Sequence, residues 1–159
     1  MASEKNKNLK TRTETVCLMN MCMILDGKGN VLALDKVNDS YTGTTFPGGH
    51  VEQNEIFSKS MIREVWEETG LTIESPRLCG LYHWHKGGIH KIITLYKAEK
   101  FSGTLTSSEE GRVYWTPLEE FKKQKLAVGM EYVLQLMESE QISECYLTME
   151  EGKYVGHLY

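Results

Sequence analysis

Three glutamates in a short stretch of this chain have the spacing of a metal site. Glu64, Glu67 and Glu68 lie three and four residues apart, and an α-helix puts such residues on one face, because each residue turns it by about 100°. Carboxylates this close repel one another, at a cost of roughly a few tenths of a kcal/mol per pair. A hard divalent cation such as Mg²⁺ removes the repulsion and also binds phosphate oxygens. The spacing therefore predicts a magnesium site that faces a phosphate group.

The residues around these glutamates follow a longer pattern. A lone Glu-x-x-Glu-Glu is usually a solvated acidic helix face, but here Gly49, Glu55 and Arg63 precede it and Gly70-Leu71 follows it. Seven fixed identities at frequencies of about 5–7% each would match by chance on the order of once in 10⁸ to 10⁹ positions. The segment 49–71, named here the Nudix box, resembles the complete signature of the Nudix (MutT-like) hydrolases, G-x5-E-x7-R-E-U-x-E-E-x-G-U with U apolar.

The resemblance implies a fold, a reaction and roles for individual residues. The fold is α/β, the Nudix fold, an α/β/α sandwich with a mixed β-sheet. We expect one such domain over residues 13–159, after a flexible tail at 1–12. The reaction is hydrolysis of a nucleoside diphosphate-linked substrate with Mg²⁺, or with Mn²⁺ in its place. The implied metal ligands are Glu64, Glu67, Glu68 and the main-chain carbonyl of Gly49. Arg63 is implied to orient these ligands through an ion pair with Glu55.

Hydrolysis of a phosphoric anhydride also needs a base that takes a proton from the attacking water. A carboxylate beside Mg²⁺ suits this step, because the ion lowers the pKa of bound water. The candidates are Glu64 and Glu67 within the box and Glu110 outside it, since some Nudix enzymes take a further ligand or base from such a place. The alternative for Glu109 and Glu110 is an ordinary acidic turn, and this choice stays open.

Two further segments are candidates for substrate contacts. Gly48-Gly49 lacks Cβ atoms, so its backbone can approach a charged ligand closely. His83 and His85 fall on one face of a predicted strand, and His90 follows a Gly-Gly pair. Three interpretations of this histidine segment stay open: a hairpin that stacks a nucleobase, a zinc site completed by Cys79, and a plain surface hairpin. The ligand spacing matches no common zinc site.

The box glutamates need a helix that holds them in place. That helix is predicted from Glu55 to Thr69, with Asn54 as its N-terminal cap and Gly70 as a left-handed terminator. An apolar stripe beside the glutamates would pack on a sheet; it consists of Phe57, Met61 and Val65. A second apolar strip, Ile62 and Trp66, is either core or a contact surface.

Strands and shorter helices are predicted on both sides of the box, because turn residues separate apolar runs. The predicted strands are about Thr13–Leu25, Val31–Val37, Thr72–Trp84, Lys91–Phe101, Arg112–Thr116, Cys145–Met149 and Tyr154–Leu158. A short helix is predicted from Pro117 and a longer one over Gly129–Glu140. The segment Asn38–Thr45 is predicted to be a loop able to close over a ligand. Strands interleaved with a few helices favour an α/β sandwich with a mixed sheet.

Composition and charge exclude several classes of protein. The chain has 159 residues, 40% of them hydrophobic, and a net charge of −4, which argues against a protein that coats nucleic acid. Its cysteines contain no Cys-x-x-Cys pair, so a zinc ribbon or a disulfide framework is disfavoured. The apolar run Val16–Leu25 lacks a following cleavage site, so a buried hairpin is favoured over a signal peptide. No run reaches the roughly 18–20 apolar residues of a membrane span. We expect a cytoplasmic protein without a membrane partner, and a homodimer stays open.

Residues outside the box say little about the substrate. The family markers of NADH, ADP-ribose and dinucleoside-polyphosphate hydrolases are missing from their usual positions. Trp115-Thr116-Pro117 and the terminal hairpin resemble MutT-like enzymes that act on oxidised purine nucleotides, although Thr45 stands where some of these carry a base-reading Asn. The favoured substrate is a nucleoside triphosphate, such as 8-oxo-dGTP, cut to the monophosphate and pyrophosphate. The alternatives are ADP-ribose or another nucleotide sugar or dinucleotide, a sensor that binds nucleotide without hydrolysis, and an interaction module with a structural acidic helix.

Overall fold

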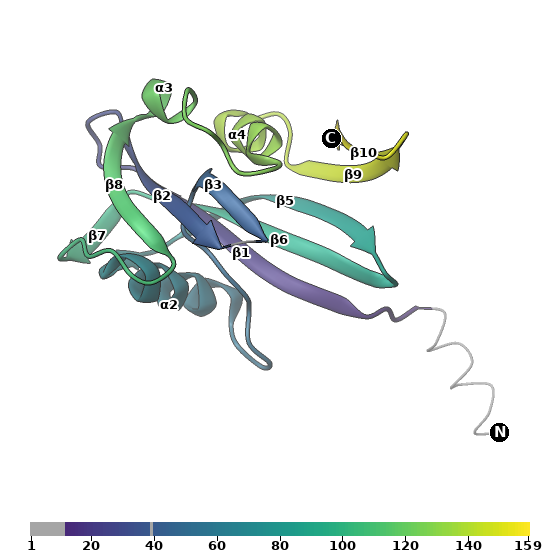
Figure 1. Cartoon of the computed structure of the whole chain (residues 1–159). Coiled ribbons are helices and arrows are strands. Elements are labelled where there is room, and N and C mark those ends of the chain that lie inside the picture. Colours follow the sequence, from purple (N-terminus) through teal and green to yellow (C-terminus); the bar gives the residue numbers. More distant parts are fainter. Residues whose placement is uncertain (1–11, 39) are drawn as a thin grey trace.

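The computed structural model of the chain describes residues 12–38 and 40–159 (Figure 1). Nearly all of the predicted tail, residues 1–12, lies outside this range, so that prediction is untested. No helix among the described residues has the length and apolar character needed to cross a membrane.

The largest sheet has five strands and mixes parallel with antiparallel pairs. Its strand order is β1-β6-β5-β9-β10. The bounds of these strands are Val16–Ile24 for β1, Ile89–Ala98 for β6, Arg77–Lys86 for β5, Glu144–Glu150 for β9 and Lys153–Leu158 for β10. Strand β1 is parallel to β6, β5 is antiparallel to β6 and parallel to β9, and β9 and β10 form the predicted closing hairpin.

Two smaller sheets complete the strand layers. One has the order β3-β2-β8 and the other pairs β4 with β7. Their bounds are Asn30–Asn38 for β2, Tyr41–Thr45 for β3, Gly111–Pro117 for β8, Leu71–Glu74 for β4 and Lys100–Gly103 for β7.

Three predicted segments need correction. The loop predicted over Asn38–Thr45 is wrong in its second half, because Tyr41–Thr45 is rich in β-branched threonine and pairs with β2 as β3. The strands predicted as Thr72–Trp84 and Lys91–Phe101 are each two strands. A left-handed residue, Ser75 with φ 49°, separates β4 from β5, and Glu99 stands between β6 and β7.

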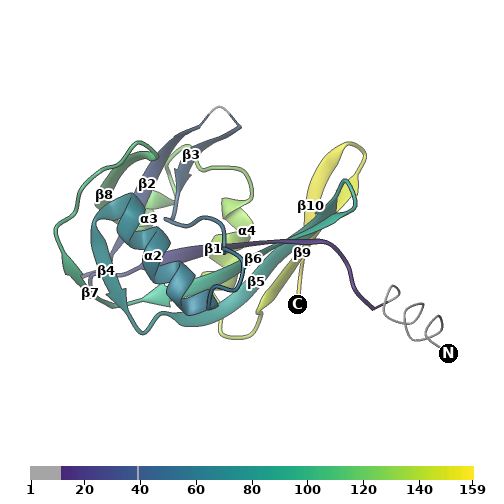
Figure 2. The same cartoon turned by 90° about the horizontal axis from the view of Figure 1, so that it is seen from below.

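Helices lie on both sides of these strands (Figures 1 and 2). Helix α2, Phe57–Thr69, contacts β1 and β4, whereas α4, Met130–Glu138, contacts β5, β6 and β9. The short helix α3, Leu118–Phe121, follows Pro117 directly and contacts β2 and β8. The predicted α/β/α sandwich with a mixed sheet is confirmed.

Alternation along β1 and β2 builds a core on each side of the strands. Met21 and Met23 pack in one cluster with α4 residues such as Met137, whereas Cys22 and Ile24 pack in the other cluster with Met61 and Val65 of α2. Strand β2 divides in the same way, with Val31 and Ala33 in the first cluster and Leu32 and Leu34 in the second. Successive side chains of a strand point to opposite faces. Strands β1 and β2 therefore lie between the α2 cluster and the α4 cluster and contribute to both.

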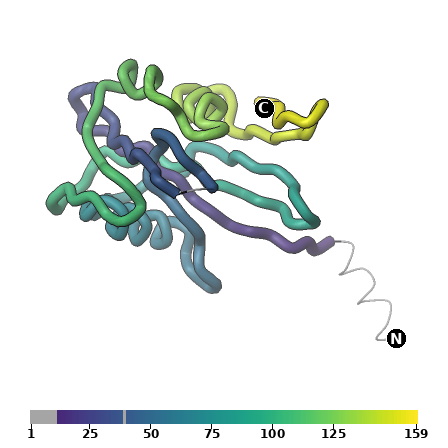
Figure 3. The backbone as a smooth tube through the Cα atoms, in the orientation of Figure 1, coloured from purple at the N-terminus to yellow at the C-terminus, as the bar shows by residue number. Residues whose placement is uncertain are grey.

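Helix α2 begins later than predicted. It starts at Phe57 rather than Glu55, and its N-terminus has no side-chain cap. Asn54 is not the cap, because the cap position belongs to Ile56. Asn54 lies two residues earlier and forms a left-handed turn with φ 62°. Figure 3 shows the chain leaving β3, running through a loop beside the sheet and turning back into α2. At the other end, Gly70 is the predicted left-handed terminator, with φ 74°.

Candidate active site

Arg63, in the middle of helix α2, is the centre of an ion-pair network. Its guanidinium holds Glu55 with two hydrogen bonds, from Nε to Oε1 at 2.8 Å and from Nη2 to Oε2 at 3.0 Å. Nη1 donates to Glu64 Oε1 at 2.8 Å and to Glu67 Oε2 at 3.1 Å. Nη2 also donates to the carbonyl of His50 at 3.0 Å. The expected Arg63–Glu55 pair is therefore present, and it lowers the pKa of Glu55 to about 2.

Glu68 is the most buried of the box glutamates, with 4% of its surface exposed. Its Oε2 accepts a hydrogen bond from the backbone N–H of Gly48 at 2.9 Å. Its Oε1 lies 3.7 Å from Lys36 Nζ, which also lies 3.2 Å from Glu110 Oε2. Burial raises the pKa of Glu68 to about 7, and it also raises the pKa of Glu64. Keeping these carboxylates charged in a buried position costs free energy, and a bound cation would lower that cost. 

Gly48 and Gly49, where the box begins, lie against the strands and the glutamates. The N–H of Gly49 donates to Asn20 Oδ1 at 3.0 Å, and its carbonyl accepts from the backbone N–H of Asn20 at 2.8 Å. A Cβ at Gly48 would overlap the carbonyl of Asn20, and one at Gly49 would overlap the carboxylate of Glu64. Gly48 therefore needs glycine for space, whereas a side chain at Gly49 would force the Glu64 carboxylate to move. The Gly49 carbonyl, an expected metal ligand, keeps a second lone pair.

One open hollow brings the box together with a distant turn. It has a volume of about 270 Å³, and its lining residues are Glu64, Glu67, Glu68, Ser108, Glu109 and Glu110. The 108–111 segment is a tight turn, closed by the hydrogen bond from the Glu110 N–H to Ser108 Oγ at 3.2 Å. Glu109 and Glu110 therefore lie in a turn, as one alternative held, and this turn lines the same hollow as the box glutamates.

Comparison with known proteins decides the family. A family model described as the NUDIX domain matches residues 19–137. The chain belongs to the Nudix family. A MutT-like protein of Streptomyces ambofaciens is 31% identical over 130 residues, which are 80% of this chain and 79% of that protein. The uncharacterized Nudix hydrolase YvcI of Bacillus subtilis is 32% identical over 97 residues, which are 57% of this chain and only 61% of that protein.

A solved structure agrees with the fold. The mutator MutT protein from Bacillus halodurans superposes with a TM-score of 0.74 at 24% identity, and the match covers 89% of this chain and 97% of that one. This structure confirms the predicted fold. The family model and the relatives confirm the family and, with it, the prediction of a hydrolase of this family.

The donor set of this Nudix site suits a hard divalent ion. Every side chain that faces the hollow from the box is a carboxylate, and Mg²⁺ and Mn²⁺ prefer oxygen ligands. Among the described residues the box glutamates do not make a group of three with all ligand atoms within 4.8 Å. Glu64 and Glu67 turn toward Arg63, and Glu68 turns toward Gly48 and Lys36. A bound ion would take over part of these contacts.

Lys36 was missed, although the sequence carried a signal for it. Leu32 and Leu34 of β2 pack beneath α2, and Lys36 is the next residue of the same face by the two-residue period of a strand. It therefore reaches the glutamate that α2 buries. Ser108 carried no comparable signal.

The structure places the predicted substrate-binding histidines elsewhere. His83 and His85 do not line the hollow; they lie near the end of the β5–β6 hairpin with His90 and Glu14. Cys79 lies apart from them and donates its thiol to the carbonyl of Leu95 at 3.2 Å. A zinc site completed by Cys79 is therefore wrong.

Proposed function

We propose that this Nudix protein hydrolyses a nucleoside diphosphate-linked substrate, and that a nucleoside triphosphate is cut to the monophosphate and pyrophosphate. One observation carries the proposal. The hollow gathers the box carboxylates and those of a distant turn at one place, with the backbone of Gly48 beside Glu68. These carboxylates and a polyphosphate are both negatively charged and repel each other. A polyphosphate can therefore bind in this hollow only when divalent cations lie between it and the carboxylates.

The residues around the hollow have different roles in the proposed reaction. Glu64, Glu67, Glu68 and the carbonyl of Gly49 would hold Mg²⁺, or Mn²⁺ in its place, which supplies charge neutralisation on the phosphoryl oxygens. Arg63 keeps Glu64 and Glu67 oriented through its bonds to both and to Glu55. Lys36, placed between Glu68 and Glu110, would donate to phosphate oxygens.

The proton of the attacking water needs a carboxylate acceptor. Water adds its oxygen to phosphorus, the bridging P–O bond breaks toward pyrophosphate, and the proton passes to Glu64, Glu67 or Glu110. Glu67 and Glu110 stand at the rim of the hollow, with about half of each side chain exposed. Glu110 comes from the turn before β8 rather than from α2, so it could act on a water that the box glutamates do not hold.

The nucleoside triphosphate is favoured by the names of the similar proteins. The S. ambofaciens relative is described as MutT-like and the B. halodurans structure as a mutator MutT protein. Thr45, at the position where some of these enzymes carry a base-reading Asn, is 2% exposed. ADP-ribose and other nucleotide sugars or dinucleotides are the alternative substrates. We propose the cytoplasm as the compartment, which agrees with four free cysteines.

The test is a panel of nucleoside triphosphates, 8-oxo-dGTP and diphosphate-linked nucleotides, each with Mg²⁺ or Mn²⁺ and with the products identified. We expect Glu67→Gln to lower turnover by about 10²-fold or more, because it removes a ligand from the ion that stabilises the transition state. Glu74→Gln is the matched control, since Glu74 is exposed on β4. Near-normal turnover in Glu67→Gln would contradict the proposal.

Calorimetry separates the non-enzymatic alternatives. Metal-dependent nucleotide binding without any product would indicate a sensor. Binding that does not depend on metal at all, or no binding, would indicate that the acidic helix serves an interaction module.

A further inference from the structure

Three histidines and two glutamates form a network on one face of the large sheet, apart from the hollow. His85 and His90 stand directly opposite each other in the β5–β6 pair. His83 lies two residues before His85 and so faces the same side. Figures 1 and 2 show the end of this hairpin well away from α2. The network therefore belongs to a different part of the molecule from the Nudix box.

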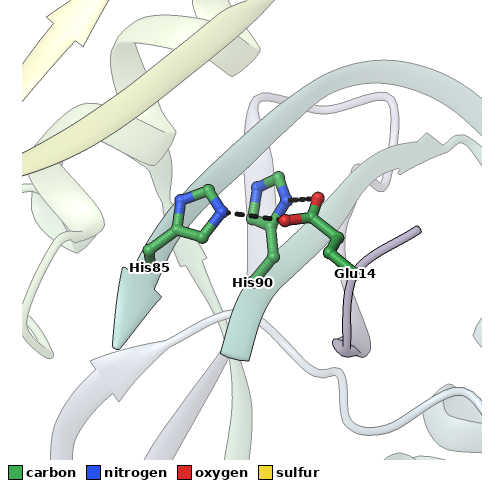
Figure 4. Close-up of side chains that lie close together, drawn as sticks. All are labelled: Glu14, His85 and His90. Atoms are coloured by element: carbon green, nitrogen blue, oxygen red, sulfur yellow. Dashed lines mark hydrogen bonds and ion pairs between the residues drawn. The ribbon is translucent and has the colours of Figure 1, made fainter. Parts of the chain in front are cut away.

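Glu14 reaches the two opposite histidines from just before β1. Strand β1 runs parallel to β6 with Val16 beside His90, and the His90 N–H donates to the carbonyl of Thr15 at 2.9 Å. This pairing fixes the backbone next to Glu14. Its Oε1 lies 2.6 Å from His90 Nδ1, and its Oε2 lies 3.1 Å from His85 Nε2. The two rings stack with centroids 4.0 Å apart and present these nitrogens to the same carboxylate (Figure 4).

We propose that Glu14, His85 and His90 form a second metal site, which takes a zinc-class divalent ion. Among the described residues, these three are the group whose ligand atoms all lie within 4.8 Å of one another. Two imidazoles and one carboxylate are a known ligand set for Zn²⁺. Mg²⁺ avoids nitrogen ligands, so the two sites of this chain select different ions.

The ring nitrogens that face away from the ion have their own partners. His85 Nδ1 lies 3.0 Å from the Tyr146 hydroxyl. His90 Nε2 lies 2.8 Å from His83 Nδ1, and His83 Nε2 lies 2.8 Å from Glu144 Oε1. With the ion on His85 Nε2 and His90 Nδ1, each outer nitrogen donates outward and the chain ends on a carboxylate. Such outer hydrogen bonds fix the tautomer and orientation of metal-binding histidines.

Strand β9 supplies this outer layer. Its parallel pairing sets His83 beside Tyr146 and Leu81 beside Glu144. The network thus joins the segment before β1, the β5–β6 hairpin and β9. Side chains of Glu14 and His85 are 52% and 48% exposed, so an ion can enter from solvent and keep an open position for water.

This proposed site differs from the zinc site with Cys79, and it disfavours a hairpin that stacks a nucleobase. The sequence suggested zinc with Cys79, and the structure puts Glu14 in that place. A hairpin that stacks a nucleobase would need the faces of His83 and His85, and the ring of His85 is stacked on His90. The proposal does not depend on the hydrolase activity.

The test is calorimetric titration of the full chain with ZnCl₂ in excess MgCl₂, which keeps the Nudix box occupied by Mg²⁺. We expect one zinc ion per chain. Glu14→Gln, His85→Gln and His90→Gln should each weaken zinc binding by at least about 10-fold, and Glu144→Gln by about 10-fold through the outer hydrogen bonds. Two of the three ligand side chains are half-exposed, so these variants are expected to fold.

Matched controls separate this site from others. His157→Gln removes a histidine of β10 that pairs with Glu150, and Glu67→Gln removes a ligand of the Nudix box. Both should bind zinc as the unaltered chain does. On zinc addition, the imidazole ¹⁵N signals of His85 and His90 should shift more than that of His157. The proposal is overturned if no zinc binds, if Glu14→Gln and His85→Gln titrate normally, or if Glu67→Gln alone abolishes binding.

Discussion

Arg63 shows why a single residue can organise the candidate site. Its planar guanidinium offers five N–H donors, and its contacts reach three carboxylates and one carbonyl. Lysine has the same charge but lacks the fork that grips Glu55 with two bonds. The pair therefore ties the loop before α2 to the helix that carries the proposed metal ligands.

The Arg63–Glu55 pair predicts a pH dependence of stability. The pKa of Glu55 falls from an ordinary 4.5 to about 2 in the folded protein. Its stabilising contribution is thus present above pH 4.5 and is lost as the pH falls toward 2. We expect Glu55→Gln to lower the free energy of unfolding by about 1–2 kcal/mol at pH 7, with a smaller difference at pH 3. Urea unfolding at both pH values checks this, with Glu74→Gln as the control.

Substitutions of Gly48 and Gly49 are expected to have different effects, one on stability and the other on hydrolysis. In Gly48→Ala the new Cβ meets backbone, the carbonyl of Asn20, whereas in Gly49→Ala it meets the movable end of Glu64. We expect Gly48→Ala to lose about 1–3 kcal/mol of stability. Gly49→Ala should stay within about 1 kcal/mol of the unaltered chain but lose hydrolysis, since Glu64 must move. Thermal unfolding and turnover, measured on both variants, check this. Equal stability losses would contradict it.

At the scale of elements, β2 places a cation under the box helix. Leu32, Leu34 and Lys36 follow one face, and Lys36 emerges between Glu68 and Glu110. We expect Lys36→Met to lower kcat/KM for a triphosphate substrate by about 10-fold, because a charge-assisted bond to phosphate is lost. Lys28→Met is the control, since Lys28 is exposed in the turn before β2. Unchanged kinetics in Lys36→Met would remove Lys36 from the substrate site.

The bounds of some helices and strands could be predicted from the sequence, and those of others could not. The body of α2 and its end at Gly70 follow from local patterns, a 3.6-residue period and a left-handed stop. The start was misplaced because Asn54, a good capping residue, takes a left-handed turn instead. Strand β3 was missed because its polar threonines read as a loop, and only pairing with β2 makes them a strand.

The Nudix site and the histidine site both depend on pairing between strands far apart in the sequence, and this limited their prediction. The opposition of His85 and His90 was within reach, because a Gly-Gly turn sets the register of a two-residue hairpin. Glu14 was not, since it depends on the parallel pairing of β1 with β6, far away in sequence. Glu110 was placed near the box only by resemblance, and its approach depends on the pairing of β2 with β8.

At the scale of the molecule, two core clusters lie on opposite sides of β1 and β2. We expect the cluster that contains α2 to affect turnover more than the cluster that contains α4. Met61 and Leu136 are both fully buried. Met61 lies on the buried face of α2, and Leu136 lies on α4 in the other cluster. We expect Met61→Ala and Leu136→Ala each to cost about 2–5 kcal/mol of stability. At a temperature where both variants remain folded, Met61→Ala should lose more turnover, because it loosens the helix that carries the glutamates. Equal losses of turnover would indicate that the clusters act as one unit.

Each of the two proposed ion sites has a tryptophan next to it in the sequence. Trp66 stands between Val65 and Glu67 on α2 and is 59% exposed, whereas Trp84 stands between His83 and His85 and packs edge-on against Tyr82. The third indole, Trp115, lies on β8 against Phe101. Chains that retain only Trp66 or only Trp84 would therefore emit from beside one site each. Their fluorescence could follow magnesium and zinc loading independently, without an added dye.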